Sequence, residues 1–145
     1  MRIVIAATGR LKAGPEQELF GRYLDRAEKA GRRLGLSFRL REHAESRAAD
    51  APGRREREAA EMLAGLPPGT RIAVLDERGR TLDSRSFAAA IAGWRDGGVE
   101  DGAFVIGGPD GLGAAIVEQA SLRLAFGAMT WPHQMVRIML AEQLY

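Results

Sequence analysis

The sequence FVIGGPDGLG, residues 104–113, joins a short apolar run to a loop with four glycines in seven positions. Such a run is typical of a buried strand, and the glycines indicate either a difficult turn or a backbone that approaches a ligand closely. Neither GxGxxG nor Gly-Lys-Ser/Thr is present, which excludes a Rossmann fingerprint and a P-loop. Pro109 supplies no N–H and Asp110 would repel phosphate, although Asp110 could cap a helix beginning near Gly111. The loop therefore suits a neutral or cationic ligand, or is simply a turn between a strand and a helix.

Strands and helices alternate along the rest of the chain, as the spacing of apolar residues indicates. We predict strands at residues 2–7, 36–41, 71–75, 103–106 and 122–126. We predict helices at residues 16–34, 54–66, 87–94 and 134–145, with a further short helix before residue 122. This order predicts a single α/β domain over residues 1–145, with a mainly parallel sheet flanked by helices.

Three loops follow predicted strands and should meet at one edge of this sheet. They contain VLDERG (74–79), IGGPDG (106–111) and FGAMTWPH (126–133). Ligands of parallel sheets gather beyond the carboxyl ends of the strands. The third loop combines a glycine, a hydroxyl and an aromatic ring, and so can form an apolar slot in which main-chain groups recognise an adenine ring. The alternatives to a binding role are that Trp131 is a core or dimer contact and that His133 is a helix cap.

Composition limits the class of protein. The chain has 145 residues and no cysteine, which excludes disulfides, thiolate metal sites and a cysteine nucleophile. The apolar stretch in MRIVIAATG is too short for a signal peptide, and no later stretch is long enough to span a membrane. We therefore expect a cytoplasmic protein with no membrane partner and no metal.

Charge is distributed unevenly between the two halves of the chain. Residues 1–57 carry 14 Lys and Arg against 8 Asp and Glu, whereas residues 58–145 carry 7 against 11. Arginine forks onto phosphate and stacks on bases, so the first half, including Arg54, Arg55 and Arg57, is a candidate RNA-binding face. The alternative is an ordinary solvent-exposed helix face, with an arginine bias set by the base composition of the genome.

The motifs resemble those of the RlmH family of SPOUT methyltransferases. The resemblance rests on Leu75-Asp76, on IGGPDGL at 106–112 and on AMTWPHQMVRIMLAEQLY at 128–145, where the family has IGGPEGL and LTLPHxLVRxLxAExLY. It covers essentially the whole chain. It implies a SPOUT-type fold with a deep trefoil knot, a homodimer, and methylation by S-adenosylmethionine of a pseudouridine N3 in helix 69 of 23S rRNA in the assembled ribosome, with no DNA partner.

The resemblance also implies site residues. Cofactor contacts fall on Leu75, Gly108, Gly127, Ala128, Met129, Thr130, Trp131 and Pro132. His133 is then a base or hydrogen-bonding group for the acceptor, and Arg137 grips phosphate or balances the developing imidate charge. Asp110 replaces the family's Glu, and Trp131 replaces a smaller apolar residue.

The end of the motif region carries a further expectation. Family members continue past LY with an arginine, a tryptophan and a HPYHR-like tail, whereas the sequence here ends at Tyr145. A chain without that tail is expected to bind S-adenosylmethionine but to methylate poorly. Two rival functions remain: a non-catalytic ribosome- or RNA-binding module that keeps the fold, and an enzyme acting on a small nucleotide, which would leave the arginine-rich half without a partner.

Overall fold

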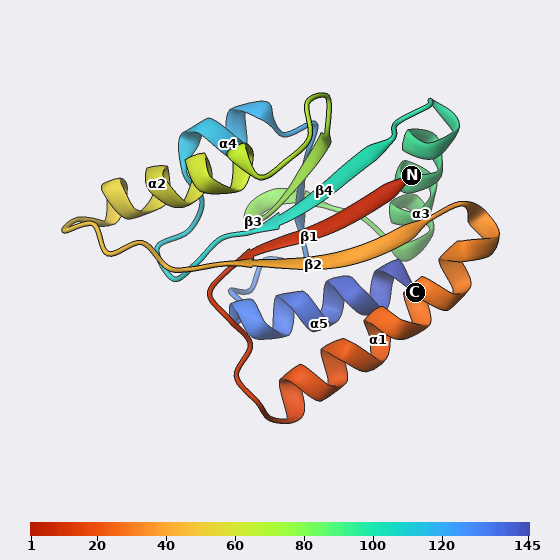
Figure 1. The fold of residues 1–145 in the computed structure, drawn as a ribbon, viewed down its shortest axis with the longest axis horizontal. Helices are drawn as coiled ribbons and strands as arrows, with labels where there is room; N and C mark the ends of the chain where they lie inside the picture. The colour runs from red at the N-terminus through yellow and green to blue at the C-terminus, as the bar shows by residue number, and fades with distance from the viewer.

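The computed structural model describes all 145 residues and has a parallel sheet between two layers of helices (Figure 1). The strands are β1 (Arg2–Thr8), β2 (Ser37–His43), β3 (Arg71–Thr81), β4 (Asp101–Ile106) and β5 (Leu122–Ala125). The helices are α1 (Pro15–Gly31), α2 (Ala51–Ala64), α3 (Ser84–Asp96), α4 (Ala114–Gln119) and α5 (His133–Leu144), with a 3₁₀ turn, η1 (Arg32–Leu34), after α1. The strand order is β2-β1-β4-β3-β5 and every pair is parallel, so the predicted elements and sheet type are confirmed.

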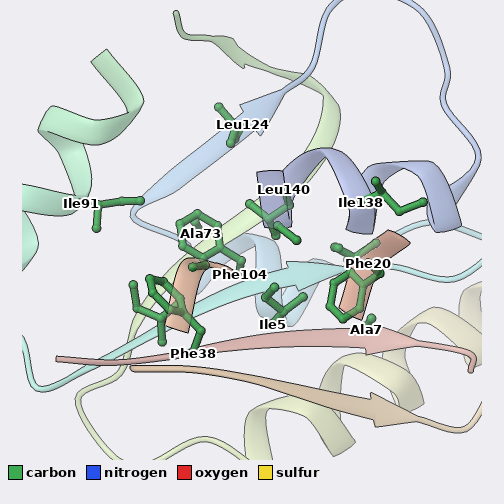
Figure 2. Packing of buried hydrophobic residues seen from close by; sticks show 14 of the residues in the cluster. Ile5, Ala7, Phe20, Phe38, Ala73, Ile91, Phe104, Leu124, Ile138 and Leu140 are labelled. Atoms are coloured by element: carbon green, nitrogen blue, oxygen red, sulfur yellow. The ribbon is translucent and has the colours of Figure 1, made fainter. Parts of the chain in front are cut away.

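The central strands bury both of their faces. In β1, Ile3 and Ile5 point into one core cluster and Ala6 into the other, because successive side chains of a strand lie on opposite faces. The first cluster includes residues of α1, α3 and α5, and the second includes residues of α2 and α4. In Figure 2, Leu140 and Ile138 of α5 lie over Ile5 and Phe104 of the sheet. This double burial explains the continuous apolar runs of these strands.

Several boundaries differ from the prediction. Helix α1 ends at Gly31 rather than residue 34, and Gly35 follows η1 with a left-handed φ of 68°. Strand β3 continues to Thr81, with a register shift against β5 between Leu75 and Arg80. A Cβ on Gly79 would lie 2.7 Å from the carbonyl carbon and oxygen of Arg123, so glycine is needed where β3 passes the backbone of β5. No helix has both the length and the apolar character needed to cross a bilayer.

Candidate functional site

A cavity of about 860 Å³ lies at the carboxyl ends of β4 and β5, beside the middle of β3. Leu75 pairs with Ile106 on one side and with Leu124 on the other, and all three residues line the cavity. Much of the remaining wall comes from within residues 76–78, 107–112 and 126–133. The three segments therefore converge as predicted, although residues 74–79 belong to β3 and are not a loop. Of the residues predicted from the resemblance, all except Ala128 and Arg137 line this cavity.

The glycines of the loop at 107–113 are required chiefly by the protein itself. A Cβ on Gly108 would lie 2.8 Å from Cγ2 of Thr8, and one on Gly107 would lie 2.7 Å from the carbonyl oxygen of Gly111. A Cβ on Gly113 would lie 2.6 Å from the carbonyl oxygen of Arg55, and Gly111 has a left-handed φ of 89°. Close packing and turn geometry thus account for these positions.

Asp110 does not cap a helix. Residue Gly113 occupies the N-cap of α4 without a side-chain bond, and the side chain of Asp110 instead pairs with Arg54 of α2 at 2.6 Å. This hydrogen bond from Arg54 lowers the pKa of Asp110. The sequence-based expectation of a cap was wrong because the competing arginine lies far away in the chain but close in space.

The loop at 127–132 offers unpaired backbone groups. None of the N–H groups of residues 127–131 donates a backbone hydrogen bond, and none of their carbonyls accepts one. Side chains hold the loop in place: Thr130 Oγ1 donates to Glu77 Oε2 at 2.8 Å, and Trp131 Nε1 donates to the carbonyl of Phe126 at 3.2 Å. Gly127 makes the turn into the loop with φ of 106°. Because side-chain bonds fix this loop and its main-chain donors and acceptors stay free, the loop can recognise a heterocyclic ring along the edge of the ring.

Charged side chains of both signs surround the cavity. Asp76 accepts from Arg123 at 2.6 Å and from the N–H of Arg78 at 2.9 Å. Burial alone would raise the pKa of Asp76, but these hydrogen bonds and the two arginine charges lower it overall. Arg55 and Arg123 also line the cavity. No motif in the sequence indicates that these two arginines lie here. The free backbone groups fit a ligand with a heterocyclic ring, such as S-adenosylmethionine.

His133 begins α5 and lines the cavity. Burial, followed by the charge of Arg137, lowers the pKa of His133, and Glu45 opposes this shift only in part. A histidine with a pKa below its usual value of 6.5 is neutral at pH 7 and can accept a proton. The position and protonation state therefore suit a hydrogen-bond acceptor or base at the cavity edge.

Arg137 lies inside the protein rather than in the cavity. Its side chain is 0% exposed. It donates to Glu42 Oε1 at 2.9 Å, to the carbonyl of Thr8 at 2.6 Å and to that of Gly9 at 2.9 Å. Both terminal nitrogens are thus engaged with β1 and β2, which argues against the predicted contact between Arg137 and an acceptor phosphate or base.

The whole chain, residues 1–145, matches the family model described as "Predicted SPOUT methyltransferase". The fold is therefore that of a SPOUT methyltransferase, as the motifs predict. Ribosomal RNA large subunit methyltransferase H from Sinorhizobium fredii is 53% identical over 146 residues, and its namesake from Rhodopseudomonas palustris strain BisB18 is 52% identical; each comparison covers 100% of this chain and 91% of the relative. The chain belongs to the SPOUT methyltransferases and, within them, to the family of the ribosomal RNA large subunit methyltransferases H.

A solved structure gives a more distant likeness. The SpoU methyltransferase AviRb from Streptomyces viridochromogenes, in complex with AdoMet, is 11% identical with a TM-score of 0.43, over 99% of this chain and 58% of that one.

Proposed function

We propose that this protein transfers a methyl group from S-adenosylmethionine to N3 of a pseudouridine in helix 69 of 23S rRNA, within the assembled ribosome. Membership of the methyltransferase H family supports an rRNA substrate. S-adenosylmethionine is the methyl donor of SPOUT methyltransferases. The structural observation that carries the proposal is the loop at 127–131, whose free backbone groups face no protein partner beside the cavity.

The residues proposed for the donor are Leu75, Gly108, Gly127, Ala128, Met129, Thr130, Trp131 and Pro132. When bound, S-adenosylmethionine supplies a methyl group on a sulfonium, so that the new N–C bond forms as the S–C bond breaks and the N3 proton leaves. The chain contributes alignment of two reactants in one cavity. Neutral His133 is proposed to accept the N3 proton or to hydrogen-bond the imide. For Arg137 we propose a positioning role, because its guanidinium is bound to β1 and β2.

Methyl transfer is tested with S-adenosylmethionine radiolabelled in the methyl group. We expect label in 23S rRNA when ribosomes are offered, and little label in free rRNA or nucleotides. Replacing His133 with asparagine should lower the rate about 100-fold, as expected when a proton acceptor is lost, with donor affinity unchanged. The control is Ser86→Ala, a change at an exposed residue of α3 that lies outside the cavity and is not one of the basic residues proposed to contact the ribosome.

Three results would contradict parts of this proposal. Ribosome binding without any label would support the non-catalytic RNA-binding module. Labelling of nucleotides alone would support the small-nucleotide enzyme. An unchanged rate in His133→Asn would remove His133 from the reaction.

Arginines on the first half of the chain are proposed to contact the ribosome. Arg22, Lys29, Arg32 and Arg33 are exposed on α1 and η1. Arg26, also exposed, lies 5.7 Å from the ring centroids of both Tyr23 and Tyr145. Contacts between basic side chains and rRNA phosphates make binding strongly dependent on salt concentration. A ribosomal substrate also supports a cytoplasmic location.

A homodimer is proposed because large apolar side chains remain exposed near the start of α5. Met129 is 72% exposed, Trp131 41% and Met135 38%. An isolated chain rarely leaves three such neighbours uncovered, and closed symmetric dimers are the commonest way to cover them.

Light scattering should therefore give twice the chain mass of 15.7 kDa at micromolar concentration. Met135→Glu should weaken the dimer at least about tenfold, because it places a charge in an apolar interface. Leu34→Glu, a change of the same kind at another exposed apolar residue, should not. A monomer in the unmodified protein, or a dimer indifferent to Met135→Glu, would contradict the proposed interface.

A further inference from the structure

The start of α2 contacts the glycine-rich loop at 107–113 through a series of side-chain bonds. Arg54 donates to both carboxylate oxygens of Asp110, from Nε at 2.6 Å and from Nη2 at 3.0 Å. The same guanidinium donates from Nη1 to the carbonyls of Ala48 at 3.1 Å and Ala49 at 3.3 Å. One side chain therefore joins the segment before α2, α2 itself and the loop after β4.

The next two residues of α2 reach the same loop. Arg55 Nη1 lies 3.5 Å from the carbonyl oxygen of Asp110, and Glu56 Oε1 accepts from the N–H of Ala114 at 2.8 Å. Glu56 thereby caps α4, the task that sequence reasoning gave to Asp110. Arg57, in contrast, is exposed and makes no hydrogen bond or ion pair.

The loop has little internal support of its own. Its internal backbone hydrogen bond runs from the N–H of Gly111 to the carbonyl of Gly108, at 3.0 Å. Because of its glycines, such a segment has many accessible backbone conformations besides the one in the folded protein. A bidentate, charge-assisted pair to a helix is the kind of contact that selects one of those conformations.

We propose that Arg54 and Asp110 are positioning residues for the donor site: the pair holds the loop at 107–113 in the conformation that forms one wall of the cavity. This inference rests on the proposed use of S-adenosylmethionine. It also divides the basic cluster that the sequence indicates at 54–57. Arg54 serves the donor side of the reaction, and Arg57 remains free for rRNA.

Calorimetry with S-adenosylmethionine and the full chain tests the pair. Arg54→Ala and Asp110→Ala should each weaken donor binding about fivefold to tenfold, because the loop must then be ordered by the ligand. The double variant should bind the donor no more weakly than the single variant with the lower affinity, since each change removes the same interaction. Amide exchange of Gly111 and Ala114, measured without ligand, should quicken in all three variants.

Arg57→Ala is the matched control, because it removes the same charge from the same helix. It should leave donor affinity and loop exchange unchanged, while the KM for ribosomes rises. Arg54→Lys keeps the charge but has one nitrogen in place of the guanidinium fork, so it should restore part of the lost affinity for S-adenosylmethionine. It serves as the test if an alanine variant folds poorly.

The outcomes separate the two proposals. If the unmodified protein binds the donor and the Arg54 and Asp110 variants bind it equally well, the positioning role is wrong and the proposed function stands. A lower melting temperature with unchanged donor affinity would also overturn it, since the pair would then be structural only. If the unmodified protein does not bind S-adenosylmethionine, the proposed function fails and this inference fails with it.

Discussion

Replacing Arg137 with methionine is expected to destabilise the protein by about 3–5 kcal/mol, as breaking a buried ion pair does. The methionine fills much of the space but leaves the carboxylate of Glu42 and the carbonyls of Thr8 and Gly9 without the donor they share. Thermal unfolding should show a fall in Tm of roughly 10 °C for a domain of this size. The pKa of His133 should rise, because the charge of Arg137 contributes to lowering it.

Arg33→Met provides the control, since Arg33 is exposed and has no hydrogen bond or ion pair. Its effect should stay within about 0.5 kcal/mol. Arg137→Lys distinguishes a positioning role from direct action on the acceptor: a direct role predicts a loss of kcat with little loss of stability. A stable Arg137→Met variant with a normal rate would contradict both roles.

Replacing Gly108 with alanine is expected to lower the affinity for S-adenosylmethionine at least about tenfold, equivalent to about 1.4 kcal/mol. The added Cβ would lie 2.8 Å from Cγ2 of Thr8 and 3.3 Å from Oε2 of Glu58, so the loop must move. The movement would be transmitted to the cavity wall, which the backbone of this loop forms. Calorimetry measures the loss, and far-UV circular dichroism should show that the fold is retained.

Thr8→Ser provides a rescue experiment, because it removes the methyl carbon against which the new Cβ collides. The double variant Gly108→Ala, Thr8→Ser should recover much of the affinity, whereas Thr8→Ser alone should change it little. If the double variant binds no better than Gly108→Ala, the added methyl group obstructs the ligand directly. The glycine would then serve close approach to the donor rather than packing against β1.

These two sites show that the cavity depends on contacts behind its walls. A Cβ on Gly108 would meet Thr8 of β1 and Glu58 of α2, while Arg137 donates to the carbonyls of Thr8 and Gly9 at the end of β1. Thr130 is held in the same way by Glu77 of β3. The loops at the cavity are therefore bound by side chains from α2 and β3, namely Arg54 and Glu77.

Local sequence was sufficient to predict most elements and the edge of the sheet where the loops meet. Apolar runs such as those around Ile5, Ala73 and Phe104 indicate strands buried on both faces, because a strand between two helical layers is apolar at successive positions. Turn residues mark the strand ends. The family motifs added the residues proposed to bind the donor, which periodicity alone does not predict.

The extension of β3 to Thr81 was not predictable from its own residues. Asp76, Glu77 and Arg78 lack the apolar pattern of a strand, and the extension is held instead by pairing with β5 and by the bond between Asp76 and Arg123. Propensity describes a segment in isolation, whereas here the neighbouring strand and its side chains decide the conformation.

The sequence by itself determined the fold class and the three segments that meet at the edge of the sheet, because both depend on patterns among residues that are neighbours in the chain. Only the tertiary structure decided the roles of Arg54, Asp110 and Arg137. Arg54 and Asp110 lie 56 positions apart, and Arg137 and Thr8 lie 129 apart. Whether a charged side chain meets solvent, RNA or a buried carbonyl depends on which distant segments the folded core brings beside it, and no local pattern carries that information.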